Sequence, residues 1–544
     1  MPRTNPQTGM FTDGVRTSYR SFIIRKRREY LVNNIENYEL EMKDNHKSPR
    51  YSYNSHKSQR PRTKRLKDTR SLQIAIVGAG ISGLSAALTL LDSKLFTPKN
   101  IHIYDANNYI GGRMHTTLWL PEYQTSEWCG EFLDSNHDFM MNLTKRFNLS
   151  LIDTIDPTDS DGSRGTYYFL KQFYNASEAW RDYQAISDTI KQQLELIGDV
   201  NYNETNSDAT YFDNLSLYDW IEKYIPNGHQ SQFGAYIDSA YTQEYGLDTR
   251  EQSSLNFLLA ISPESQPENG PLSIYGPSDQ RYRIKDGNYL LPEAISKYLT
   301  KQKISINLNY NLTKISINDN KKISLRFQND ETYIYDHVIL TLPTTTLKYV
   351  DYSEAKFDSL KKRVINELKY GTTTKLNLQF KERFWLKLSS DGVIYTDLPF
   401  LNSWEATSGQ KGETGILTLF TGGTIGTSFE PKKGINTLTT SNCNKNTFLY
   451  IEGFLDDLNE IWPNASTYYT GKGTISAPWV DKHFLGSYPA YTLGQYSTIS
   501  GYEKERQMNI HFSGDYTSPD LQGFMEGAAS EGDRAANEII ADYS

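Results

Sequence analysis

The stretch Ile74-Ala75-Ile76-Val77-Gly78-Ala79-Gly80-Ile81-Ser82-Gly83-Leu84 decides the fold of this chain. Its apolar start is typical of a buried parallel strand. Gly78, Gly80 and Gly83 form the pattern GxGxxG, which allows a tight turn and lets backbone N–H groups approach a pyrophosphate at a helix N-terminus. The stretch therefore predicts a strand, a turn and a helix that together bind a dinucleotide.

A second apolar run supplies the acidic partner of this pattern. Ile101-His102-Ile103-Tyr104-Asp105 ends on a carboxylate 22 residues past Gly83, where contact with a ribose 2′-hydroxyl is expected. A membrane span is the competing interpretation, because Ser71 to Leu91 carries no charge and has about the right length. Three glycines in six residues and a hydrophobic content of 37% favour strand, turn and helix in a soluble chain.

Three further blocks resemble the flavin amine oxidase family. Gly111-Gly112-Arg113 follows the acidic strand end, and in that family the glycines admit the flavin while the arginine meets the pyrophosphate. His511 to Ser518, followed by Gln522 to Ala536, resembles the C-terminal flavin motif of the same family. A third block, Trp479 with Gly486 to Gln495, resembles the segment beside the flavin ring. The resemblance implies FAD as the cofactor.

The resemblance also implies a fold, which is α/β with a discontinuous Rossmann-like FAD-binding domain and a mixed α+β substrate domain. We expect the FAD-binding domain over residues 70–150, 275–345 and 485–544, and the substrate domain over 150–275 and 345–485. Apolar periodicity predicts the individual elements. Helices are expected over 84–91, 136–148 and 291–299 and through most of 175–265, and strands over 304–317, 323–327 and 336–343.

Three residues match positions that meet the substrate in this family. Lys375 lies in the expected strand before Phe380 and matches the lysine that holds a water near flavin N5. Tyr488 and Phe524 match the two positions that sandwich the substrate amine in front of the flavin. A solvated strand lysine and two core aromatics are the alternatives, since alternation alone does not say which strand face is buried.

Two more positions concern the flavin itself. Gly514 and Asp515 precede a further expected helix, whose apolar positions run from Met525 to Ile540 on one face. Its N-terminus would direct a positive dipole end at the flavin N1–C2 carbonyl region. The family usually has glutamate where this chain has Asp515, and a cap or turn role is the alternative for it. Ser487 stands where some monoamine oxidases carry a cysteine bonded to the flavin. Serine cannot form that thioether, so FAD is expected to bind non-covalently.

The chemistry implied is oxidation of the CH–NH2 group of an L-amino acid or amine, with imine hydrolysis and formation of hydrogen peroxide from molecular oxygen. L-amino acid oxidases of the family place an arginine shortly after the Gly-Gly-Arg turn to clamp the substrate carboxylate. The corresponding stretch here has no arginine, but it has Glu131 and Asp134, which suit a cationic group. Alternatively, Glu131 is structural, Asp134 caps the next helix, and Arg281, Arg283 or another residue forms the clamp.

Three other activities compete with an oxidase. They are a decarboxylating amino-acid 2-monooxygenase, a carotenoid-type desaturase and a flavin-fold interaction protein without turnover. Lys375, Tyr488 and Phe524 together weigh against the last two. No metal cluster, Walker motif or Ser-His-Asp set is evident, so no metal is expected at the site.

Residues 1–70 form a separate basic arm with 17 Lys and Arg against 7 Asp and Glu, whereas residues 71–544 carry a net charge of −18. Ser21 to Met42 predicts an amphipathic helix, and the rest of the arm a loose linker. The arm could pack as a helix on the catalytic body. Alternatively, it could contact a membrane surface, contact nucleic acid or be a removable pro-segment, and we weigh these three roles together equally with packing. With two cysteines and only a degenerate twin-arginine-like segment at Tyr19 to Ile23, we expect a cytoplasmic enzyme for which a homo-oligomer is allowed.

Overall fold

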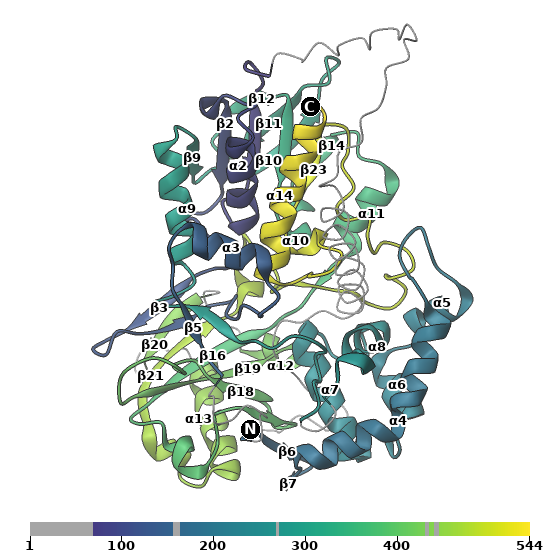
Figure 1. Cartoon of the computed structure of the whole chain (residues 1–544), viewed down its shortest axis with the longest axis vertical. Coiled ribbons are helices and arrows are strands. Elements are labelled where there is room, and N and C mark those ends of the chain that lie inside the picture. The colour runs from purple at the N-terminus through teal and green to yellow at the C-terminus, as the bar shows by residue number, and fades with distance from the viewer. Residues whose placement is uncertain (1–68, 156–163, 268–270, 430–434, 440–444) are drawn as a thin grey trace, which may run out of the picture.

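The structure is a computed structural model, and it describes residues 69–155, 164–267, 271–429, 435–439 and 445–544. The basic arm therefore lies outside the described residues, apart from its last two positions. A five-stranded parallel sheet in the order β23-β13-β1-β2-β9 forms the centre of one half of the molecule (Figure 1). Its strands are β1 (Ile74–Val77), β2 (Ile101–Asp105), β9 (Ser305–Leu308), β13 (His337–Leu340) and β23 (Ile510–Phe512).

The two faces of this sheet are covered by different layers, as the alternation of β1 requires. Ile74 and Ile76 pack among four helices, α2 (Ile81–Asp92), α3 (Asp138–Arg146), α9 (Leu290–Lys301) and α14 (Met525–Ala541). Ala75 and Val77 pack against a four-stranded sheet in the order β12-β11-β10-β14. Its strands are β10 (Leu312–Ile317), β11 (Ile323–Phe327), β12 (Thr332–Tyr335) and β14 (Asp351–Glu354).

Close packing joins the first and last helices of this half, which lie side by side in Figure 1. Gly532 of α14 is so near α2 that a Cβ there would lie 2.1 Å from the Ser82 carbonyl oxygen. Only a residue without a side chain fits such an approach. The C-terminal segment therefore completes the same layer that the first glycine turn begins.

The other half is built on an eight-stranded sheet in the order β20-β21-β16-β19-β18-β17-β6-β7. Its strands are β6 (Thr166–Phe169), β7 (Gln172–Phe173), β16 (Thr374–Phe380), β17 (Ile394–Thr396), β18 (Asn402–Glu405), β19 (Gly415–Thr421), β20 (Ile435–Thr439) and β21 (Tyr469–Ser476). Helices cover it: α4 (Ala176–Ile197), α5 (Ser207–Asn214), α6 (Leu217–Tyr224), α7 (Gln232–Tyr245), α8 (Leu255–Ile261), α12 (Gly423–Ser428) and α13 (Lys445–Ile461).

Short elements connect the two halves. Strands β3 (Thr116–Trp119) and β4 (Gln124–Glu127) form a hairpin, β5 (Leu151–Asp153) pairs with β8 (Tyr282–Ile284), and β15 (Lys369–Tyr370) pairs with β22 (Pro489–Ala490). Along the chain, helix α10 (Thr344–Leu347) lies between β13 and β14, and helix α11 (Ser359–Glu367) lies between β14 and β15.

The predicted membrane alternative over Ser71 to Leu91 is wrong, because that stretch divides into β1, a glycine turn and α2. Within the described ranges, no helix is long and apolar enough to cross a membrane. The predicted helices at 84–91, 136–148 and 291–299 are confirmed as α2, α3 and α9 with shifted ends. The mainly helical stretch 175–265 is confirmed as five separate α-helices.

Candidate active site

A cavity of about 510 Å³ lies where the carboxyl ends of the parallel strands meet the eight-stranded sheet. Ligands in open α/β sheets bind at this edge. Ten of the eleven residues that the sequence singled out line the cavity, and Gly83 is the exception. They are Gly78, Gly80, Asp105, Gly112, Arg113, Lys375, Tyr488, Gly514, Asp515 and Phe524.

The glycine turn consists of Gly78, Gly80 and Gly83, and the first two of these line one wall of the cavity. Gly78 has φ +116°, and a Cβ there would lie 2.0 Å from Thr341 Oγ1. A Cβ on Gly83 would lie 2.0 Å from the carbonyl oxygen of Gly78, so Gly83 brings α2 against the turn. Gly80, by contrast, has open space where a Cβ would stand. Two glycines thus shape the turn, and the third leaves its backbone accessible from the cavity.

Asp105 fixes the position of the same turn. Its Oδ2 accepts a hydrogen bond from Ala79 N at 2.7 Å, and its Oδ1 accepts one from Asn107 N at 2.8 Å. Burial raises the pKa of the Asp105 carboxyl, and these backbone donors oppose that shift. The carboxylate therefore ties the end of β2 to the glycine turn at the cavity wall.

Arg113 reaches across the cavity to the C-terminal segment. Its Nη2 donates to Asp515 Oδ1 at 2.5 Å, and its Nη1 donates to the carbonyl oxygen of Ser487. Within the described part of the chain, Ser487 Oγ and Asp515 Oδ2 are buried without a hydrogen-bond partner. Buried polar atoms in native proteins are normally hydrogen-bonded. These two cavity-lining atoms therefore mark a place for a polar ligand.

Lys375 lies on the polar face of β16. Leu376, Leu378 and Phe380 turn into a hydrophobic core, so the alternation places Lys375 on the opposite face, toward the cavity. Its side chain is buried, and Nζ donates to the carbonyl oxygen of Cys129 at 2.7 Å and to Glu131 Oε2 at 2.8 Å. The alternative of a solvated strand lysine is wrong.

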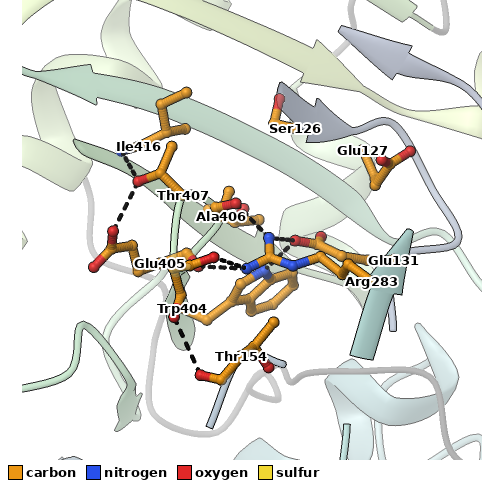
Figure 2. A network of polar contacts seen from close by, with 12 residues as sticks. Ser126, Glu127, Glu131, Thr154, Arg283, Trp404, Glu405, Ala406, Thr407 and Ile416 are labelled. Atoms are coloured by element: carbon orange, nitrogen blue, oxygen red, sulfur yellow. Dashed lines mark hydrogen bonds and ion pairs between the residues drawn. The ribbon is translucent and has the colours of Figure 1, made fainter. Parts of the chain in front are cut away.

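Glu131 connects Lys375 to two further donors. Its Oε1 accepts from Arg283 Nη1 at 3.1 Å and from Trp404 Nε1 at 2.9 Å, as Figure 2 shows. We call these four residues (Glu131, Lys375, Arg283 and Trp404) the Glu131 cluster. Because two cations share the carboxylate, its charge is already balanced. The two ion pairs are evidence against Glu131 as an open binding site for a cationic substrate. They favour the alternative in which Glu131 has a structural role.

The predicted aromatic pair, Tyr488 and Phe524, lines the cavity, and Phe524 also lines a smaller neighbouring cavity together with Lys375. Both side chains are 8% exposed. The Tyr488 hydroxyl donates to the carbonyl oxygen of Gln243 at 3.3 Å, while Phe524 is the N-cap residue of α14 and packs edge-on against His137 with ring centroids 5.1 Å apart. Each residue is thus held by a different element, and both border the cavity rather than only a core.

Two residues differ from their sequence-based expectations. Asp134 does not cap α3, whose N-cap is His137. Instead, Asp134 accepts hydrogen bonds from Ser278 Oγ at 2.5 Å and Gln280 N at 2.9 Å, because the chain returns beside it in β8. Arg281 pairs with Asp153 at 2.7 Å on the surface and does not line the cavity. Neither Arg281 nor Arg283 therefore offers an open clamp for a carboxylate.

Glu127 was missed by the sequence reasoning. It is buried at the end of β4 and accepts from Asn288 N at 2.9 Å and from Thr116 Oγ1 at 2.9 Å. Burial raises the pKa of Glu127 to about 8, so the carboxyl holds a proton at neutral pH. The one available signal was a carboxylate inside a strand beside the Cys129 to Asn136 stretch.

Comparison with known proteins gives relatives that match most of the chain. It is 25% identical to "Putative L-amino-acid oxidase YobN" of Bacillus subtilis (strain 168), covering 86% of this chain and 94% of that protein. It is 21% identical to polyamine oxidase 7 of Oryza sativa subsp. japonica, covering 84% and 92%.

Solved structures show the same fold. Cyclohexylamine oxidase from Brevibacterium oxydans matches with a TM-score of 0.71 at 16% identity, covering 87% of this chain and 99% of that one. Putrescine oxidase bound to putrescine matches with a TM-score of 0.68 at 16% identity, covering 86% and 99%. The family model of flavin containing amine oxidoreductases matches residues 81–540. The chain therefore belongs to the flavin containing amine oxidoreductase family.

Proposed function

We propose that the chain is an FAD-dependent oxidase that removes a hydride from the carbon next to the nitrogen of an amine and uses molecular oxygen as the final acceptor. One observation carries this proposal. A single cavity brings together the glycine turn, the Arg113–Asp515 pair, Lys375 and the aromatic pair, although these residues are spread from Gly78 to Phe524.

The parallel sheet with its helices supports a discontinuous Rossmann-like FAD-binding domain, because its strands come from all three expected segments, 70–150, 275–345 and 485–544. Packing of the described residues supports different positions for two of the expected boundaries. Residues 347–365 pack in the core beside this sheet, and residues 490–499 pack in the core of the helical part of the other half. We therefore place the boundaries near 370 and 500 instead of 345 and 485.

The residues present fit FAD. The accessible backbone at Gly80 suits a pyrophosphate at the start of α2, and the carboxylate of Asp105 suits a ribose hydroxyl. The buried Ser487 Oγ and Asp515 Oδ2 have no hydrogen-bond partner among the described residues, and they suit contacts with polar atoms of FAD. Because residue 487 is a serine, we propose that FAD binds without a covalent bond at that position.

Bound FAD supplies the two-electron acceptor for the amine and, once reduced, the donor to oxygen. The protein contributes orientation and charge. The aromatic pair restricts the approach of the substrate nitrogen and carbon, and the low polarity of its rings favours a neutral amine over an ammonium. Lys375 lines the same cavity with its buried side chain, and we propose that its positive charge stabilises developing negative charge on oxygen.

An amine without an α-carboxylate is the substrate class that we favour. Among the described residues that line the cavity, Arg113 and Lys375 already pair with carboxylates. The remaining basic side chains of the lining are Lys482 and His483. Burial lowers the pKa of His483 below its ordinary value, and its electrostatic interaction with Asp105 places it on the Asp105 side of the cavity. An L-amino acid is the second candidate, because a relative that matches 86% of the chain bears that name.

A peroxide-coupled assay on matched pairs separates these candidates. Each pair differs only by the α-carboxylate: tyramine and tyrosine, phenethylamine and phenylalanine, putrescine and ornithine, cadaverine and lysine. We expect peroxide from at least one amine and much less from its amino acid. The opposite order would favour the amino-acid candidate. Oxygen consumption without equal peroxide would indicate a monooxygenase, and no turnover with any compound would contradict an oxidase.

A further inference from the structure

We propose that Glu131 is a positioning residue that keeps Lys375 charged and directed at the cavity, and that Arg283 sets the strength of this effect. This inference rests on the proposed function, because it concerns the cation that would act beside the flavin. It assigns a role to two residues that lie 152 positions apart in the sequence.

The two carboxylate oxygens of Glu131 have different partners: one is fixed by two donors, and the other accepts from Lys375. Oε1 accepts from both Arg283 Nη1 at 3.1 Å and Trp404 Nε1 at 2.9 Å. Oε2 accepts from Lys375 Nζ at 2.8 Å. Two donors on one oxygen fix the plane of the carboxylate, so the second oxygen has a defined direction. The Lys375 ammonium is thereby placed between Oε2 and the carbonyl oxygen of Cys129.

Arg283 is itself fixed from behind, which makes it a suitable anchor. Its guanidinium donates to the carbonyl oxygens of Ala406, Glu405 and Ser408 as well as to Glu131, as Figure 2 shows for the first two. Arg283 remains charged at any accessible pH. The three buried side chains therefore alternate in charge: Arg283 is positive, Glu131 is negative and Lys375 is positive. Together they carry one net positive charge next to the cavity.

Removing the anion would leave two cations facing each other in a buried site. Lys375, Glu131 and Arg283 are each 5% exposed, so water screens them poorly. Desolvation and a like charge both favour the neutral form of a lysine. Arginine cannot lose its proton, so the lysine must respond. In Glu131→Gln, the ammonium of Lys375 would therefore lose its counter-charge and face Arg283 directly, with Glu127 and Cys129 as the other ionisable groups that interact with it.

The test is a sulfite titration of the FAD-loaded protein between pH 6 and pH 10, monitored by bleaching of the visible flavin band. Every protein compared carries Glu127→Gln, because the Glu127 carboxyl, whose pKa is about 8, titrates in the same window and interacts with Lys375. Sulfite is an anion, so its affinity reports positive charge near the flavin ring and needs no amine. We expect the pH midpoint for loss of sulfite affinity to fall by at least one unit in Glu131→Gln. In Glu131→Gln/Arg283→Met, the midpoint should move back up, because the repelling cation is gone.

Rescue by the second substitution separates charge coupling from a merely structural role. If Glu131→Gln does not fold, the comparison of Glu131→Gln/Arg283→Met with Arg283→Met carries the test, since these differ only in the charge of residue 131. We expect the lower midpoint in the former. Equal midpoints in that pair, or an unchanged midpoint in Glu131→Gln, would overturn the inference. An inactive wild type that still binds sulfite would overturn only the proposed function.

Discussion

Lys375 is the residue on which the proposed use of oxygen depends. Its ammonium is buried at the cavity wall and anchored by Glu131 and the carbonyl oxygen of Cys129. Lys375→Met removes this charge while it keeps a side chain of similar length. We expect reoxidation of the reduced flavin by oxygen to slow by about 100-fold or more, because charge and proton donation are both lost. Flavin reduction by amine should change far less, and stopped-flow measurement of each half-reaction checks this.

Lys381 provides a matched control for that variant. It is an exposed lysine just past the end of the same strand, and it donates to the carbonyl oxygen of Thr467. Lys381→Met should leave both half-reactions at wild-type rates. If Lys375→Met slowed reduction and reoxidation equally, the role in oxygen chemistry would be refuted.

Glu127 makes a prediction about pH. Its pKa is about 8 in the folded protein and near 4.5 in the unfolded chain, so the folded state holds the extra proton between these values. The free energy of unfolding therefore falls as pH rises through this window, by on the order of a few kcal/mol in total. Glu127→Gln lacks this titration. Relative to the wild type, it should gain stability from pH 5 to pH 9 in urea unfolding, and parallel curves would contradict the buried neutral carboxyl.

The residues that sequence reasoning found are those whose role is carried by local pattern. Gly78, Gly80 and Asp105 belong to one short motif, and the structure gathers them at one wall. The Glu131 cluster could not be assembled in this way, because Arg283 lies 152 residues from Glu131 and Lys375 lies 244 residues from it. The sequence shows the carboxylate of Glu131 but not its pairing with Arg283 and Lys375. For that reason it suggested a cationic substrate, which the two ion pairs disfavour.

At the scale of elements, two glycines of the turn between β1 and α2 have different roles: we expect one to affect cofactor binding and the other to affect folding. Gly80→Ala adds a methyl group into open space, so the stability of the apo-protein should change by less than about 0.5 kcal/mol while FAD affinity falls. Gly83→Ala places a methyl group 2.0 Å from the carbonyl oxygen of Gly78 and should cost about 1–3 kcal/mol in folding itself. FAD titration and urea unfolding check the pair. Equal effects of both variants on stability would contradict the geometry of the turn.

Elements with a strong period were predictable, and those set by tertiary contacts were not. The heptad-like spacing in α4 and the apolar run of β1 determine their own structure. Asp134 was expected to cap α3 because it precedes that helix. The hydrogen bonds from Ser278 and Gln280 compete for its carboxylate, and these come from a segment 144 and 146 residues away. The tendency of Asp134 to cap the following helix is therefore overridden by hydrogen-bond donors that only the tertiary fold brings near it.

At the scale of the whole molecule, the mode of FAD attachment gives a simple test. Residue 487 is a serine, and Cys129 is the one free thiol recorded in the described ranges. We expect denaturation with acid or guanidinium to release all of the flavin into the filtrate. Flavin that remains on the chain would refute non-covalent binding, and Cys129→Ser would show whether that cavity-lining thiol carries it.

The arrangement of the two halves follows from long-range pairings that a sequence pattern shows only through family resemblance. Strand β23 joins the parallel sheet beside β13, although 169 residues lie between Leu340 and Ile510. The order of strands in the eight-stranded sheet, in which β6 lies beside β17, was not anticipated at all. Parallel strands from separate segments leave no local signal of their neighbours, so the site between the halves was predicted only in outline.

Anaerobic mixing of the purified yellow protein with amines tests the central proposal most directly. No oxygen and no coupling enzyme take part, so the visible flavin band reports transfer of electrons from the substrate alone. We expect at least one primary amine without an α-carboxylate to bleach the band rapidly and completely, with its intensity restored on admission of air. If no amine and no L-amino acid bleached the flavin of a folded, FAD-loaded protein, the assignment as an amine-oxidising enzyme would be contradicted.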